Sequence, residues 1–277
     1  MFLNVRNLAC VVLASLAAAP IAVATAEAQD FAAHRAAYVV TSLDRGRGGG
    51  NGETIGSYAF ELRANCDGGY TIHQRMKLEF QGGRTSLVSE QQSSMTESSD
   101  GKRFSFDHRT TANGKVTSQF KGDAALDGGG AGQARFSEPE GQTVALPAET
   151  LFPVAIARAT VRRALAGENG FEAPFFFGDK VKPPQAANIL IGKVPKRLAD
   201  LPTPDGAAAL VAGQERIYFR GGFFDVSDGK VAGDPAYEMS SVTLANGIEL
   251  YGTNEQADVA IEYKLTRLEP LPKPECK

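Results

Sequence analysis

Residues able to carry chemistry are few in this chain of 277 residues, which holds three histidines and three cysteines. His34, His73 and His108 lie far apart, and no second group at ligand spacing accompanies them. Metal and catalytic sites need several such groups within mutual reach. His34 has the chemistry of a base, but nothing in the sequence places a nucleophile beside it. The sequence therefore predicts no metal, no cofactor and no catalytic residue.

Recognisable catalytic motifs are also missing. The sequence contains no G-x-S-x-G elbow, no H-E-x-x-H and no paired cysteine motif for zinc. Because His73 falls on the polar side of an expected strand and His108 near a strand end, we interpret both as surface residues. The lone acids Asp107, Asp225 and Glu262 are equally unspecific. We predict that the protein is not an enzyme.

The N-terminus has the pattern of a signal peptide. One positive charge, Arg6, precedes the apolar run Leu8 to Ala24, and Ala26-Glu27-Ala28 fits a signal peptidase site. We expect residues 1–28 to be removed and the mature chain, residues 29–277, to be one domain. A membrane anchor is the alternative, but Pro20 interrupts a run that is already short for a bilayer. Cys10 does not sit in a lipobox and should leave with the signal.

The cysteines that remain after cleavage are Cys66 and Cys276. In an oxidising compartment two thiols have one intramolecular pairing available. Two free thiols and a disulfide between chains are the alternatives.

The charge balance excludes some partners. The chain has 29 Lys and Arg against 32 Asp and Glu, a net charge of −3, which cleavage leaves unchanged. Such a balance favours neither nucleic acid nor an anionic membrane surface. No second apolar segment reaches membrane-spanning length, so we expect a soluble mature chain, and we interpret it as a monomer.

Alternation of apolar and polar residues predicts many strands. In Thr71–Phe80, Ile72, Met76, Leu78 and Phe80 alternate with charged or polar residues, which is typical of a strand with one wet face. Similar segments lie throughout the chain: 37–43, 57–63, 85–94, 102–109, 115–120, 133–136, 189–192, 215–223, 237–244 and 258–265. Turn sequences separate them: Asp67-Gly68-Gly69, Gly82-Gly83, Asp100-Gly101, Asn113-Gly114, Asp228-Gly229 and Asn246-Gly247. The pattern predicts a mainly β, antiparallel meander.

One segment has helical spacing instead. Pro153–Leu165 lacks glycine, its apolar residues recur at helical intervals, and Gly167 is a natural stop. We predict one main helix at about 153–166. Its arginines 158, 162 and 163 lie off the apolar stripe, which is typical of a solvated face, although such a face can also dock on an acidic partner.

Two kinds of segment remain ambiguous. The glycine-rich stretches 45–52 and 127–132 lack the spacing of a phosphate-binding loop and are expected to be flexible. Phe175-Phe176-Phe177 is interpreted as part of a strand buried on both faces, with the wall of an apolar ligand site as the alternative.

The order of several short motifs resembles the EipB family. The resemblance covers nearly the whole mature chain and rests on these segments: Ala33-His34-Arg35-Ala36-Ala37-Tyr38, Cys66-Asp67-Gly68, Asp100-Gly101-Lys102, Val144-Ala145-Leu146-Pro147 leading to Phe152-Pro153, Ile191-Gly192-Lys193, Pro235-Ala236-Tyr237-Glu238, Asn246-Gly247 and Cys276. It implies a periplasmic protein with a strongly curved, open β-spiral around one helix, a disulfide between Cys66 and Cys276, and a role in cell-envelope integrity. The chain departs from the family in having no tryptophan, with Gly69-Tyr70 where members place one.

Two functions from different classes follow. The first is a non-enzymatic periplasmic factor that maintains the envelope through contacts with other envelope proteins. The second is a carrier or chaperone that holds a lipid-like ligand in the concavity of the sheet. For this concavity we predict that Phe60, Leu78, Phe80, Ile261 and Tyr263 form one continuous apolar lining that faces the helix.

Overall fold

The computed structural model describes residues 30–43, 53–82, 85–204, 207–257 and 259–276. The predictions for the signal segment 1–28, its Cys10 and the loop 45–52 lie outside these residues, and the Gly82-Gly83 turn lies partly outside them.

The first half of the chain is a run of antiparallel hairpins. Its strands are β1 (His34–Ser42), β2 (Glu53–Ala64), β3 (Tyr70–Gly82), β4 (Thr85–Glu97), β5 (Arg103–Ala112), β6 (Lys115–Leu126), β7 (Gly132–Glu138) and β8 (Thr143–Leu146). Each pairs with its sequence neighbour. The turns between them use the predicted residues: Gly68, Gly101, Asn113 and Gly114 all have positive φ.

The second half continues the same sheet from its other side. Its strands are β9 (Gly170–Phe175), β10 (Gln185–Gly192), β11 (Arg216–Phe224), β14 (Tyr237–Leu244), β15 (Glu249–Glu255) and β16 (Ala260–Pro270). Because β1 pairs with β16, the described residues form one 14-stranded antiparallel sheet whose two edges are β8 and β9. A small separate hairpin joins β12 (Val226–Ser227) to β13 (Lys230–Val231). The predicted mainly β, open and curved sheet is confirmed.

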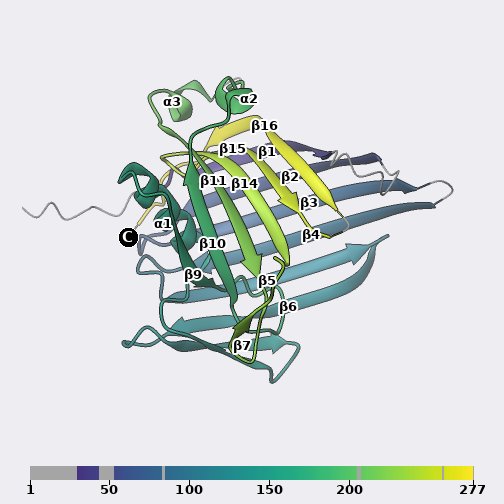
Figure 1. Ribbon diagram of the computed structural model, residues 1–277, viewed down its shortest axis with the longest axis vertical. Helices are drawn as coiled ribbons and strands as arrows, with labels where there is room; N and C mark the ends of the chain where they lie inside the picture. The colour runs from purple at the N-terminus through teal and green to yellow at the C-terminus, as the bar shows by residue number, and fades with distance from the viewer. Residues whose placement is uncertain (1–29, 44–52, 83–84, 205–206, 258, 277) are drawn as a thin grey trace, which may run out of the picture.

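The sheet folds back on itself, so that its two halves face each other. Figure 1 shows the C-terminal strands lying across the N-terminal ones. Ile217 of β11 packs in the same buried cluster as Leu62 of β2 and Ile72 of β3. We call the side on which these residues point the inner face and the opposite side the outer face. The alternation of β3 follows from this arrangement, because its inward Ile72 and Leu78 are buried while its outward lysine and arginine are exposed.

The main helix is α1 (Pro153–Leu165), as predicted. Its first residue is a proline, and its end is closed by Gly167 at φ 75°, whose N–H donates to the carbonyl of Ala164. The chain that carries α1 runs from one sheet edge, β8, to the other, β9, and Leu151 bridges to Phe175 on the way.

Two further helices of one turn each follow β10: α2 (Lys196–Ala199) and α3 (Ala208–Val211). Leu198 and Ala207 from this connection are buried against Val242 and Leu244 of β14. Those two strand residues point outward, so both faces of the sheet are covered here. In the described part of the chain no helix is long and apolar enough to cross a membrane.

Candidate functional site

The five residues predicted for the concavity share the inner face. Across the antiparallel ladders, Phe60 of β2 stands opposite Gln74 of β3, which places Leu78 and Phe80 on the same side. Val40 of β1 stands opposite Tyr263 of β16, and Ile261 lies two residues before Tyr263 on the same side of that strand. On the other side of β1, Ala36 stands opposite Phe60 of β2, so Phe60 shares this face.

These five residues differ in depth and in what covers them. Leu78, Ile261 and Tyr263 are buried, whereas Phe60 and Phe80 are partly exposed. Phe60 alone packs against the cluster that contains α1 residues; the other four pack in the cluster that takes in the α2–α3 connection. The expectation that all five face the helix therefore needs correction, because α1 covers only one end of the sheet.

Solvent reaches the middle of the inner face. A band of inward-pointing side chains there remains partly or fully exposed, although both halves of the sheet lie around it. We call it the inner-face band, and its residues are Tyr58, Phe60, Gln74, Met76, Gln91, Phe219 and Met239. The band is mainly aromatic and aliphatic, with neutral amides, which suits the enclosure of an apolar molecule.

A carboxylate lies beside this band. Glu249, at the start of β15, accepts a hydrogen bond from the Tyr263 hydroxyl at 3.3 Å through Oε1, and the hydroxyl of Ser241 lies close enough to lower its pKa. Tyr38 donates to the Glu249 backbone carbonyl at 2.9 Å. Burial raises the pKa of Glu249 to about 7, against the effect of those two side-chain hydroxyls.

The inner face otherwise carries little charge. Among the described strand residues that point inward, the charged ones are Glu97, Glu249 and, at a hairpin tip, Lys115. Glu97 lies beneath α1, far along the sheet from β15 in strand order. Glu249 therefore faces a surface of neutral side chains.

Glu97 has a structural task that the sequence did not reveal. Its side chain is buried, and its Oε2 and Oε1 accept from the backbone N–H groups of Val154 and Ala155 at 2.7 and 2.8 Å. The helix has no side-chain cap of its own at Phe152, so a residue of β4 caps it instead. Burial raises the pKa of Glu97 to about 7, while the two backbone donors and nearby Arg158 act in the opposite direction.

Two of the three histidines are buried. His73 is exposed, as predicted. The surface prediction for His108 is wrong: its Nδ1 and Nε2 contact the hydroxyl of Ser93 at 2.8 Å and the carbonyl of Phe177 at 2.9 Å. Alternation explains this, since Phe104, Phe106 and His108 share the inner face of β5. Burial lowers the pKa of His108, which favours the neutral ring.

His34 is fully buried in β1, and its ring lies tilted beside that of Phe60, with 5.4 Å between the ring centroids. Its Nδ1 lies 2.7 Å from the Ala32 carbonyl, and burial lowers its pKa.

The acids considered from the sequence take part in surface ion pairs. Asp107 pairs with Lys121 at 3.2 Å, and Glu262 pairs with Lys264 at 2.7 Å. Asp225 lies between two lysines, of which Lys180 has the larger effect, and they lower the pKa of this carboxyl to about 2. Among the described residues no group of His, Cys, Asp and Glu could hold a metal ion.

The three consecutive phenylalanines do not form a strand buried on both faces. β9 ends at Phe175, and Phe176 and Phe177 lie in the segment that follows it. Phe175 packs with β10 and β11, whereas Phe176 packs in the cluster beneath α1. The triplet joins these two clusters because the chain leaves the sheet at this point.

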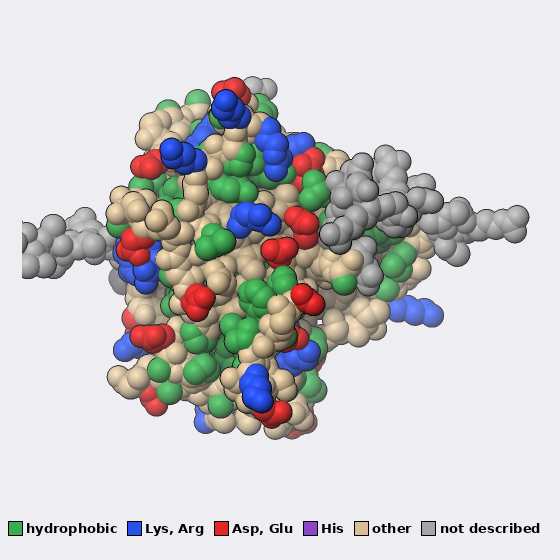
Figure 2. Space-filling model, in the orientation of Figure 1, with side chains coloured by type: hydrophobic (Ala, Val, Ile, Leu, Met, Phe, Trp, Pro, Cys, Tyr) green, Lys and Arg blue, Asp and Glu red, His purple; other side chains and the backbone are tan. Residues whose placement is uncertain are grey.

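Two shallow depressions lie on the outer face of the described strands. One, of about 440 Å³, is lined mainly by Pro174, Ala186, Phe224 and Val231 of the C-terminal strands. Figure 2 shows hydrophobic side chains gathered over these strands, and Leu190 and Val231 are 61% and 56% exposed. The other, of about 520 Å³, is polar and crosses β3 to β6. Neither involves the predicted concavity residues.

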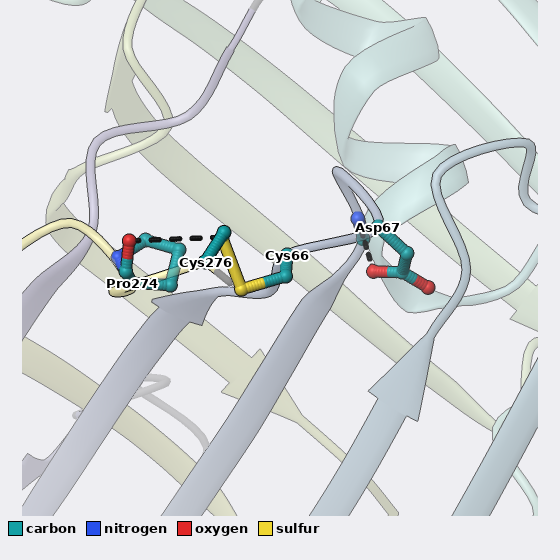
Figure 3. The surroundings of a disulfide bond; sticks show 5 residues. Cys66, Asp67, Pro274 and Cys276 are labelled. Atoms are coloured by element: carbon teal, nitrogen blue, oxygen red, sulfur yellow. Dashed lines mark hydrogen bonds between the residues drawn. A yellow bond between two sulfur atoms is a disulfide. The ribbon is translucent and has the colours of Figure 1, made fainter.

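A disulfide joins Cys66, in the turn after β2, to Cys276 in the C-terminal tail, with a Cα–Cα distance of 5.5 Å (Figure 3). Beside it, Asp67 accepts from the backbone N–H of Gly69 at 2.9 Å. The hydroxyl of Tyr70 accepts from the N–H of Phe31 at 2.8 Å, and Arg158 lies 5.0 Å over its ring. The tyrosine thus ties β3 to α1.

Comparisons with known proteins agree with this architecture. The family model described as EipB-like matches residues 25–272. The Cell envelope integrity protein EipB of Brucella abortus (strain 2308) is 26% identical over 261 residues, which cover 90% of this chain and 87% of that protein. A crystal structure of a β-barrel-like protein of a domain of unknown function, also from Brucella abortus, superposes with a TM-score of 0.74 at 24% identity, over 88% of this chain and all of the other. The chain therefore belongs to the EipB-like family.

Proposed function

We propose that this chain is a non-enzymatic periplasmic protein that supports cell-envelope integrity by holding an apolar, lipid-like molecule against the inner face of its sheet. The observation that carries the proposal is the inner-face band. Apolar side chains such as Phe60, Met76 and Phe219 lie inside the curved sheet and are still partly open to solvent. Covering them with the chain of a ligand removes apolar area from water, which is favourable by about 25 cal/mol per Å².

The envelope role is inferred from the relative named Cell envelope integrity protein EipB. The periplasmic location is inferred from the signal pattern of residues 1–28. The absence of a catalytic assembly among the described residues is compatible with a non-enzymatic protein, as is the neutral lining of the inner face.

A second candidate function is protein contact through the outer face. The depression of about 440 Å³ beside exposed Leu190 and Val231 favours it. An exposed apolar patch rimmed by polar residues such as Glu172 and Asn188 is typical of a protein interaction site.

Native mass spectrometry of protein purified from a periplasmic extract tests the first proposal and separates it from the second. We expect the wild type to retain a lipid-like mass. Met239→Lys, which places a charge in the inner-face band, should lose that mass, and Leu190→Lys, the matched change on the outer face, should keep it. Wild-type protein that carries no ligand, and takes none up from a lipid extract, would refute the proposal. Leu190→Lys protein that loses partner proteins but not lipid would favour the second candidate.

A further inference from the structure

The position of Glu249 bears on which apolar molecule the inner face accepts, an inference that rests on the proposed ligand-binding function. We propose that the ligand is an amphiphile whose polar end is a protonated amine, and that the Glu249 carboxylate accepts its N–H groups.

Glu249 has acceptor capacity to spare. A carboxylate offers about four lone-pair sites on its two oxygens. In this structure hydroxyl groups are its side-chain donors, and the Tyr263 contact, at 3.3 Å, is long for an O–H donor. Among the described residues no lysine or arginine pairs with it. A partly buried carboxylate without a cation is unfavourable, and an ammonium group would supply both the charge and the donors.

The surrounding tyrosines determine the direction of approach. The rings of Tyr38, Tyr58 and Tyr263 lie 5.2 to 5.8 Å from one another, so they are in contact and leave no room for a cation between them. Tyr38 and Tyr263 are buried, whereas Tyr58 is partly exposed. An amine therefore reaches Glu249 past Tyr58, from the side of the inner-face band, and its hydrocarbon chain lies along Phe60 and Met76.

The same surface disfavours an anionic head group. A phosphate or fatty-acid carboxylate enclosed here would meet no inward lysine or arginine within the described strands except Lys115, which lies at the tip of the β5–β6 hairpin. It would also lie near Glu249, and like charges in a poorly solvated site repel strongly.

The test compares three probes with the same twelve-carbon chain: dodecylamine, dodecanol and dodecanoate. Binding is followed by native mass spectrometry and by tyrosine fluorescence, which no tryptophan obscures because the chain has none. At about pH 8 dodecylamine is a cation, dodecanoate is an anion, and Glu249, with a pKa of about 7, is mostly ionised. We expect dodecylamine to bind wild-type protein at least about tenfold more tightly than dodecanol, and dodecanoate to bind most weakly.

Glu249→Gln should remove the preference for the amine and leave dodecanol binding unchanged. Glu238→Gln, an exposed carboxylate on the outer face of β14, is the matched control and should bind like wild type. Equal binding of all three probes by wild type would overturn the amine inference and leave the apolar-ligand proposal standing, and so would a preference for dodecanoate. Failure of every probe to bind would refute the proposed function itself. The ranking on wild type needs no variant, so it stands even if Glu249→Gln does not fold.

Discussion

Replacing Glu97 by alanine should loosen α1 from the sheet. The change removes the carboxylate that accepts from the N–H groups of Val154 and Ala155 and leaves both donors in a largely buried site. Each buried donor without an acceptor costs about 1–3 kcal/mol, so we expect a loss of about 3 kcal/mol in the free energy of unfolding. For a domain of this size that corresponds to a decrease in Tm of roughly 6–12 °C.

Thermal unfolding followed by circular dichroism measures this loss. Glu97→Gln keeps one acceptor oxygen in the same place and should fall between alanine and wild type. Glu90→Ala is the matched control, because it removes a carboxylate from the same strand on the outer face, where Glu90 pairs with Arg75 at the surface. We expect little change in its Tm.

Hydrogen exchange locates the effect. In Glu97→Ala the amides of Val154 and Ala155 should exchange faster, together with the rest of the first turn of α1. A Tm equal to that of wild type, with unchanged exchange in this turn, would refute the view that β4 caps the helix. A lower Tm with unchanged exchange would mean that the loss arises from packing instead.

Three further predictions concern β15, which carries Glu249 and Gly252, and the disulfide between Cys66 and Cys276. Burial raises the pKa of Glu249 from 4.5 to about 7, so the folded protein binds more protons than the unfolded chain in this window. The free energy of unfolding should therefore fall as pH rises from about 5 to 8, by up to about 3 kcal/mol. Urea unfolding at these two pH values should show a smaller fall in Glu249→Gln than in wild type. An equal fall in both proteins would count against Glu249 as the group that titrates. Replacing Cys66 or Cys276 by serine should lower the Tm and raise protease sensitivity, because the disulfide closes a loop spanning 210 residues. The chain-entropy model gives this loop closure at most about 5 kcal/mol of stability. Two reactive thiols in the denatured, unreduced protein would contradict the pairing. In Gly252→Ala the new Cβ would overlap the ring of Tyr263, so we expect the free energy of unfolding to fall by about 2 kcal/mol or more. Gly192→Ala is the control and should change little, because the nearest atom to its new Cβ is 3.9 Å away. Equal Tm values for the two variants would refute this packing argument.

Local patterns in the sequence predicted much of this fold. Alternation located β3 and β5, because each strand has one buried and one wetter face over several residues. Asn113-Gly114 and Asn246-Gly247 marked turns because few residues tolerate the positive φ that those turns need. The helix at 153–165 was also predicted from a local pattern, the helical spacing of its apolar residues.

Strands covered on both sides were harder to find. β15, Glu249–Glu255, includes the buried run Leu250 to Thr253, so it shows no alternation. Its outward Tyr251 is fully buried near the α2–α3 connection, a tertiary contact that the local sequence does not encode. Short β8, and β9 except for its last residue Phe175, were missed because four to six residues carry little periodicity.

Neither the buried Glu97 nor the partly buried Glu249 could be identified from its position in the sequence. Glu97 lies 57 residues from the N–H of Val154, and a lone acid at a strand end is usually exposed. Alternation does, however, place Glu97 on the inner side with Met95, as it places His108 with Phe106. A charged or polar residue on the apolar side of a strand is thus the signal that could have marked Glu97 and His108 as buried.

The pairing of β1 with β16 connects fold and proposed function. It makes the two ends of the chain the seam between the halves of the sheet, where Leu271 donates to the carbonyl of Ala33 and Cys276 lies close to β2. Tyr38 and Tyr58 belong to one side of this seam, and Tyr263 and Glu249 belong to the other. A change that opens the seam should therefore disturb ligand binding before it unfolds the outer strands, since the residues proposed to hold the head group meet only when β1 and β16 are paired.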